Sequence, residues 1–255
     1  MTEFLTTETG ARLAYNFTDG DGPCVVFLGG FRSDMAGTKA LYLEQWARAR
    51  GQAFLRLDYR GHGESDGAFL DGTIGAWAAD ARAVIEAVPS GNVTLVGSSM
   101  GGWIALLLAR QMPERIGALI GIAAAPDFTE DSMWAGMDAQ QRAALERDGQ
   151  VALPSDYDDD PYIITRALIE EGRRNLVLRA PLPLPFPVRL LQGTADTAVD
   201  VSVALRLTEH ATCPDLRLTL VKDADHRFST PACLDLIATA IEDVLSHEAE
   251  DGTAG

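Results

Sequence analysis

The chain has 255 residues, of which 47% are hydrophobic and 23% charged, values that are ordinary for a globular protein with one large core. Its net charge of −16 at pH 7 argues against binding to nucleic acid or to an anionic membrane surface, because both would repel it. No apolar run approaches the ~20 residues of a transmembrane helix, so we expect no membrane insertion.

The N-terminal residues and the cysteines bear on the cellular compartment. The opening stretch MTEFLTTETG lacks the basic and apolar regions of a secretory signal and the arginines of a transit peptide. We therefore predict a cytoplasmic protein. Cys24, Cys213 and Cys233 are an odd number without C-x-x-C spacing, which favours free thiols over a disulfide framework or a metal site.

Strands and helices alternate along the chain. Short apolar runs predict strands at 23–28, 53–58, 92–96, 118–124, 188–192 and 216–221. Helices are predicted at 38–50 and 73–88, then from the end of the third strand to 111, and at 201–210 and 231–246. This alternation predicts a mostly parallel sheet with helices on both faces. Functional groups are then expected just beyond the carboxyl ends of the strands.

Residues 126–187 interrupt this alternation between two predicted strands. They include helical patches at 138–147 and 162–175, an acidic run at 156–160, and the sequence PLPLPFP at 181–187. A structureless loop of this length would be unusual in a compact domain, so we predict a helical lid inserted above the sheet. The expected organisation is a core of residues 1–125 and 188–255 with a lid insertion at 126–187.

The stretch VTLVGSSMGGW, residues 93–103, carries the clearest chemical signal. It begins as a strand and continues into the pattern G-x-S-x-G, in which a serine occupies a tight turn between a strand and a helix. The flanking glycines are needed because a Cβ at position 97 or 101 would collide with the neighbouring chain. Ser99 has the central position and is the candidate nucleophile.

A serine nucleophile needs a base, and the chain offers four histidines. His226 follows the last predicted strand by a few residues, in KDADHRFS, and is the predicted base. The other histidines have less suitable positions: His62 lies in a loop after the second strand, His210 ends a helix, and His247 lies near the C-terminus.

The base in turn needs a carboxylate to orient it. Asp196 lies directly after the strand at 188–192 and is the predicted acid. Asp200 immediately precedes a helix, where an aspartate ordinarily serves as the N-cap. Asp225 is adjacent to His226, and side chains of adjacent residues usually diverge. The order serine, aspartate, histidine along the chain is that of α/β-hydrolases.

An oxyanion hole requires two backbone N–H groups, one of them from the residue after the nucleophile. Met100 is therefore the first candidate. The second donor is expected in the loop LGGF after the first predicted strand, where Phe31 is the candidate and Gly30 its neighbouring alternative. A plain turn at Gly29-Gly30 is the other interpretation of this loop.

Five segments now carry a resemblance: GGFRSDMAGTKA, DYRGHGESDG, VGSSMGGW, PLPFPVRLLQGTADTAV and DADHR. Together they resemble the α/β-hydrolase-domain family that includes a mitochondrial palmitoyl-protein thioesterase, also described as an acyl-glucuronide esterase. The resemblance implies an α/β-hydrolase fold with an eight-stranded, mostly parallel sheet and one antiparallel strand near the N-terminus. It also implies Ser99, Asp196 and His226 as the catalytic residues, hydrolysis of acyl esters or thioesters, and no metal or organic cofactor.

The predicted lid is the expected source of the acyl pocket. Its apolar and aromatic residues either line that pocket or pack the lid itself: Met133, Trp134, Met137, Leu153, Tyr157 and Tyr162. The expected substrate is a small acyl ester or thioester, with an S-acylated protein as a second candidate, and we expect a monomer or small homo-oligomer.

Two other functions stay open at the level of sequence. An aminopeptidase on this fold would need a carboxylate to hold the substrate amine, which Glu170, Glu171 or the acidic residues 158–160 could supply. A non-catalytic binding module would keep the fold as a scaffold, although all three catalytic residue types are present.

Overall fold

The computed structural model describes residues 1–154 and 161–252 and contains an eight-stranded sheet with the order β1-β2-β4-β3-β5-β6-β10-β12. The strands of this sheet are β1 (Glu3–Thr6), β2 (Arg12–Thr18), β3 (Asp21–Leu28), β4 (Gln52–Leu57), β5 (Val93–Ser98), β6 (Ile116–Ile122), β10 (Val188–Gly193) and β12 (Leu216–Val221). β2 runs antiparallel to both of its neighbours, β1 and β4, and the remaining pairs are parallel. The mostly parallel sheet with one antiparallel strand is confirmed.

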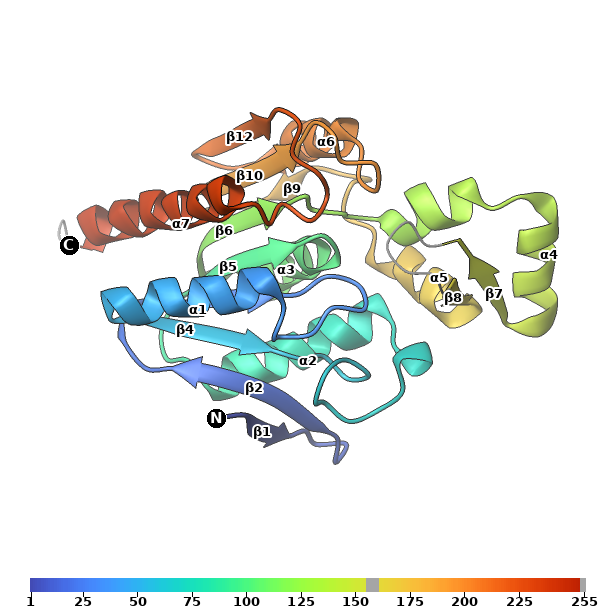
Figure 1. Ribbon diagram of the computed structural model, residues 1–255, viewed down its shortest axis with the longest axis horizontal. Helices are drawn as coiled ribbons and strands as arrows, with labels where there is room; N and C mark the ends of the chain where they lie inside the picture. The colour runs from blue at the N-terminus through green and yellow to red at the C-terminus, as the bar shows by residue number, and fades with distance from the viewer. Residues whose placement is uncertain (155–160, 253–255) are drawn as a thin grey trace.

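Two layers of helices cover the sheet (Figure 1), with α1 and α7 on one face and α2 and α3 on the other. The helices of the core are α1 (Thr38–Arg50), α2 (Ile74–Ala87), α3 (Met100–Gln111), α6 (Val201–His210) and α7 (Pro231–Gly252). Their ends follow local chemistry. Gly51 ends α1 in the left-handed conformation, and the Thr73 hydroxyl caps α2 by accepting the Ala76 N–H.

The core lies on both faces of the central strands, which is why these strands read as continuous apolar runs. Trp77 and Trp103 are fully buried on the α2 and α3 side, and Leu43 and Phe54 on the α1 and α7 side. The strand β1 is absent from the sequence prediction for the complementary reason. β1 lies at the edge and is almost wholly exposed, so it contains no apolar run that would mark a strand.

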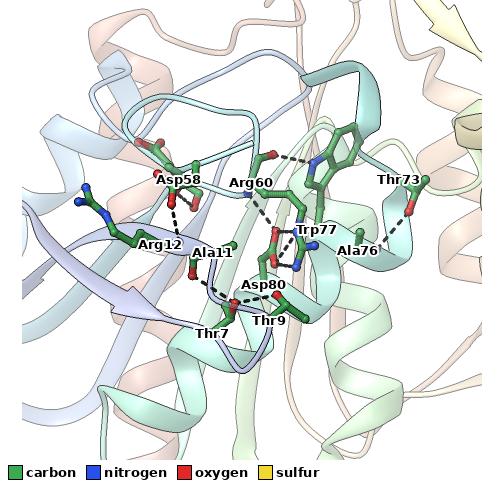
Figure 2. A network of polar contacts seen from close by, with 12 residues as sticks. Thr7, Thr9, Ala11, Arg12, Asp58, Arg60, Thr73, Ala76, Trp77 and Asp80 are labelled. Atoms are coloured by element: carbon green, nitrogen blue, oxygen red, sulfur yellow. Dashed lines mark hydrogen bonds and ion pairs between the residues drawn. The ribbon is translucent and has the colours of Figure 1, made fainter. Parts of the chain in front are cut away.

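The loop after β4 is held by an ion pair between Arg60 and the buried Asp80 (Figure 2). The Arg60 guanidinium and backbone N–H both bind the buried Asp80 carboxylate, and the Trp77 indole donates to the Arg60 carbonyl at 3.1 Å. The same loop carries His62, which is only 4% exposed and packs edge-on against the rings of Tyr59, Phe69 and Trp77. His62 is therefore a packing residue of this loop.

The segment between β6 and β10 forms an insertion, whose α4, β7, β8 and α5 lie beyond the carboxyl ends of the strands in Figure 1, while its last strand, β9, lies beside β10. Its elements are the π-helical turn η3 (Thr129–Trp134), α4 (Ala139–Asp148), β7 (Gln150–Leu153), β8 (Tyr162–Thr165), α5 (Arg166–Gly172), the 3₁₀ turn η4 (Arg173–Asn175) and β9 (Leu182–Pro183). The ends of the insertion are joined at Asp127, whose buried carboxylate accepts the N–H groups of Val177 at 2.8 Å and Leu178 at 2.9 Å.

The insertion is less helical than the sequence predicts. The helix predicted at 138–147 is confirmed as α4, which Asp138 and Gln141 begin with a reciprocal capping box. The helix predicted at 162–175 is wrong in its first turn. Residues 162–165 instead form β8, which pairs antiparallel with β7. Thr165 separates the two structures, because its hydroxyl accepts the Leu168 N–H and so starts α5 only there.

No helix among the described residues has an apolar stretch long enough to cross a bilayer.

Candidate active site

Ser99 lies in the sharp turn between β5 and α3, with φ 53° and ψ −118°. Such a conformation is strained for a residue with a side chain, so the surrounding chain must hold it. The glycines allow this close approach. A Cβ on Gly97 would lie 2.4 Å from the Gly101 carbonyl oxygen, and one on Gly101 would lie 2.1 Å from the Leu28 carbonyl oxygen. A side chain at position 97 or 101 would therefore collide with the backbone, as the sequence predicts.

The three residues predicted for catalysis lie in one hydrogen-bonded row. The distance from His226 Nε2 to Ser99 Oγ is 3.1 Å, and the distance from His226 Nδ1 to Asp196 Oδ2 is 2.9 Å. These residues follow β5, β10 and β12, and the carboxyl ends of parallel strands meet at one edge of the sheet. With Nδ1–H donated to the carboxylate, Nε2 is left as the acceptor for the serine proton.

The surroundings of Asp196 keep its carboxylate ionised. Oδ1 accepts the backbone N–H groups of Ala198 and Val199, and Oδ2 accepts the Gln192 amide in addition to His226. Burial by itself raises the pKa of Asp196. The hydrogen bonds from His226, Val199 and Gln192 outweigh it, so that the pKa of this carboxyl lies below its usual value.

The other candidate acids have separate roles in the structure. Asp200 caps α6 by accepting the Ser202 N–H at 2.8 Å, as its position before a helix predicted. Asp225 accepts the Phe228 N–H at 3.1 Å within the loop that carries His226. That loop is also tied to α1, because Lys39 Nζ donates to the Arg227 carbonyl at 2.5 Å.

The candidate oxyanion donors lie on either side of Ser99. Met100 is the first residue of α3, and the first N–H groups of a helix have no partner within it. The N–H of Phe31 donates no backbone hydrogen bond to any described residue. The Phe31 loop packs directly on the nucleophile, since a Cβ on Gly30 would lie 3.4 Å from the Ser99 Cβ. The loop is thus more than a plain turn between two elements.

Ser99 and His226 open into a cavity of about 720 Å³. Its two walls differ in chemistry. Among its described residues, the insertion contributes uncharged ones, which are Phe128, Ser132, Met133, Gly136, Gln141, Leu153, Pro154, Tyr162 and Ile164. The core contributes the charged side chains of Arg32, Asp34, Lys39 and Arg227. The apolar residues of the insertion thus lie opposite a core wall that also carries charged side chains.

The predicted pocket residues divide into three groups. Met133 and Leu153 line the cavity, as does Tyr162. Met137 does not, because it is buried in the main core cluster. Trp134 does not either, because its ring lies on the other side of the insertion between the guanidinium groups of Arg142 and Arg173. Tyr157 lies outside the described residues.

Sequence reasoning missed Phe128 and Ile164 as cavity residues. Phe128 lies just before η3, two residues after the proline that begins the insertion. Nothing in the sequence distinguishes it from the other residues of this turn. The sequence predicts a helix over 162–175, which places Ile164 in that helix, whereas it lies in the strand β8. The signal was available in the two adjacent β-branched residues, Ile163 and Ile164, which favour a strand.

Two of the carboxylates considered for an aminopeptidase, Glu170 and Glu171, lie outside the cavity. Glu171 accepts the Gly75 N–H at 2.9 Å, and Glu170 is 3.7 Å from Arg166; neither lines the cavity. Residues 158–160 are outside the described residues. Within residues 1–154 and 161–252, no group of three or more histidine, cysteine, aspartate or glutamate side chains could hold a metal ion.

Known proteins are similar in sequence to this chain over almost its whole length. The mitochondrial palmitoyl-protein thioesterase ABHD10 of Mus musculus is 35% identical over 243 residues, which cover 95% of this chain and 82% of the relative. Among solved structures, a putative hydrolase from Agrobacterium vitis S4 has a TM-score of 0.92 at 40% identity, covering 96% of this chain and 98% of that one. The mouse alpha/beta hydrolase domain-containing protein 10 has a TM-score of 0.90 at 34% identity, covering 97% and 99%.

These relatives overturn one prediction. The mouse, rat and cow proteins are all named mitochondrial, so the prediction of a cytoplasmic protein is wrong. That prediction rested on ten N-terminal residues. Several of them form the edge strand β1, and they carry no information on location.

The family assignment rests on a match in sequence and on features of the structure that agree with it. Residues 25–161 match the alpha/beta hydrolase fold, and this range contains the Ser99 turn. The sheet order, the antiparallel β2 and the turn geometry agree with the match. The chain belongs to the alpha/beta hydrolase family.

Proposed function

We propose that this protein is a serine hydrolase that cleaves carboxylic esters or thioesters of acyl groups through an acyl-enzyme on Ser99. The observation that carries the proposal is the hydrogen-bonded row from Ser99 through His226 to Asp196, which opens into a cavity with one apolar wall. A nucleophile, a base and an orienting acid in contact are the arrangement that acyl transfer requires.

In the proposed first half-reaction, His226 Nε2 takes the proton of Ser99 Oγ as the oxygen attacks the substrate carbonyl. Asp196 keeps the imidazole in the required tautomer and stabilises its charged form. The N–H groups of Phe31 and Met100 stabilise the negative oxygen, and the N-terminal end of α3 adds its positive dipole. His226 then protonates the departing alkoxide or thiolate, and water repeats the sequence on the acyl-enzyme.

The insertion serves in this proposal as a lid that supplies the acyl site. Its uncharged wall, which includes Phe128, Met133 and Leu153, suits a hydrocarbon chain. The proposal includes both oxygen esters and thioesters as substrates. The relatives named palmitoyl-protein thioesterase support including thioesters, and S-acylated proteins, among the candidate substrates.

An ester or thioester is preferred over an amide on chemical grounds. A thiolate leaves readily because thiols have pKa values of about 8.5, whereas an amine must be protonated as its bond to carbon breaks. The cavity also lacks the Glu170 and Glu171 carboxylates that a peptidase would use.

The test uses a matched oxygen ester, thioester and anilide of one acyl group, with wild type and Ser99→Ala. We expect wild type to hydrolyse both esters, to discriminate against the anilide, and to be labelled by a fluorophosphonate probe. Ser99→Ala should lose both hydrolysis and labelling. Preference for the anilide would favour the peptidase, and wild type without hydrolysis or labelling would favour the binding module.

A further inference from the structure

The loop that carries Phe31 holds a strained conformation. Arg32 has φ 57°, in the left-handed region that residues with a side chain rarely adopt. Such a conformation persists only where the surrounding structure enforces it. A hydrogen bond from the Ser33 N–H to the Gly30 carbonyl closes the turn, and side-chain contacts of Phe31 and Arg32 also hold the loop.

Those contacts come from two parts of the molecule. Among the described residues, the Phe31 ring meets four other rings edge-on. Phe69 and Trp77 belong to the core, with centroid distances of 4.9 and 6.0 Å. Phe128 and Tyr162 belong to the insertion, with distances of 5.9 and 5.8 Å. The insertion therefore supplies half of the aromatic surroundings of a predicted oxyanion donor.

Tyr162 has a second contact with the same loop. The Arg32 guanidinium carbon lies 5.4 Å from the centre of the Tyr162 ring, within the range of a cation–π interaction. Two consecutive loop residues, one of them strained, thus contact one ring on β8. Edge-to-face and cation–π contacts both depend on orientation, so together they restrict the loop more than apolar packing alone would.

We infer that Tyr162 is a positioning residue for the oxyanion hole, acting through Arg32 and Phe31 to hold the loop in its strained conformation. This inference rests on the proposed function. It assigns the insertion a part in the chemical step, in addition to binding the acyl chain. Because Phe128 and Tyr162 also line the cavity, a bound acyl chain contacts the same rings that support the loop.

The experiment measures 4-nitrophenyl acetate hydrolysis, since an acetyl group is too short to depend on the cavity residues that the insertion supplies. We expect Tyr162→Leu to lower kcat roughly 10-fold with little change in KM, within the range that loss of a cation–π contact predicts. Tyr162→Phe keeps the ring and should retain most of the activity. Trp134→Leu is the matched control: it removes a cation–π ring from the same insertion, outside the cavity, and should leave kcat unchanged.

A trifluoromethyl ketone tests whether the effect lies in the oxyanion hole. Its adduct with Ser99 places a negative oxygen in the hole, so its affinity should fall in Tyr162→Leu by the same factor as kcat/KM. Arg32→Met supplies a second variant that acts on the same contact. Since the Arg32 contact requires the Tyr162 ring, the double variant should be little worse than Tyr162→Leu alone.

Three outcomes would overturn the inference. They are wild-type kcat in Tyr162→Leu, an equal loss in Tyr162→Phe, or fully additive effects of the Arg32 and Tyr162 substitutions. A different result would refute the proposed function. Activity that survives in Ser99→Ala would refute the acyl-enzyme, whereas a dead Ser99→Ala with a fully active Tyr162→Leu would refute only the role of Tyr162.

Discussion

The candidate catalytic row and the insertion above it are built by different means. Ser99, Asp196 and His226 each follow the end of a parallel strand, and backbone hydrogen bonds or steric limits fix their places. The cavity wall from the insertion consists of side chains on short elements, whose neighbours Trp134 and Met137 face elsewhere. The position of the chemistry is thus set by the sheet, while the fit to the substrate depends on side-chain packing.

The largest effect should come from the nucleophile turn. Ser99→Ala is expected to lower kcat by on the order of 10⁴ or more, because it removes the attacking oxygen. Ser98→Ala should keep most of the activity, since only the central serine projects its hydroxyl to His226. Steady-state hydrolysis of one ester by both variants is the measurement. An inactive Ser98→Ala with an active Ser99→Ala would place the nucleophile one residue earlier.

The second effect separates two aspartates four residues apart. Asp196→Asn should lower kcat by roughly 10³ to 10⁴, because an amide cannot hold the required tautomer of His226. Asp200→Asn should keep wild-type kcat. As a helix cap, Asp200 bears on the stability of α6, and its replacement by another capping residue costs well under the ~1 kcal/mol lost with alanine. Similar losses of kcat in the two variants would contradict the assignment of the acid.

The same division between sheet and insertion explains what the sequence could predict. Strands buried on both faces leave continuous apolar runs, and the turn at Ser99 requires glycines, so the sequence predicts the central strands and the three candidate residues. The edge strand β1 leaves no such run. Within the insertion, residues 162–165 and the direction of the Trp134 ring depend on tertiary contacts, with β7 and with Arg142 and Arg173.

The role of the insertion in binding the acyl chain can be tested by comparing Met133, which lines the cavity, with its neighbour Trp134, which does not. Met133→Ala should lower kcat/KM for a decanoyl ester by about 10-fold relative to the acetyl ester, since each buried methylene is worth about 0.8 kcal/mol. Trp134→Ala should leave the ratio of the two substrates near the wild-type value, because this ring lies outside the cavity. A ratio that changes equally in both variants would mean that the insertion affects chain length only through its overall stability.

The smallest effect compares two buried aspartates, one from each region. Hydrogen bonds lower the pKa of Asp196, whereas burial raises the pKa of Asp127 in the insertion despite its bonds to Val177 and Leu178. The stability that Asp196 contributes is therefore fully present above its unfolded pKa of about 3.9 and is lost as pH falls through its lower folded value. For Asp127 the sign reverses, because folding favours its protonated form and stability is lost as pH rises from 3.9 through the higher folded value.

Urea unfolding of wild type, Asp196→Asn and Asp127→Asn at pH 6.5 and at pH 3.5 measures this difference. Neither amide titrates, so each variant removes the pH dependence of one carboxyl. On acidification, wild type should lose stability relative to Asp196→Asn and gain stability relative to Asp127→Asn. Changes of the same sign in the two comparisons would show that the core and insertion carboxylates respond alike to protonation, and that hydrogen bonds to Asp196 do not distinguish it from a merely buried acid.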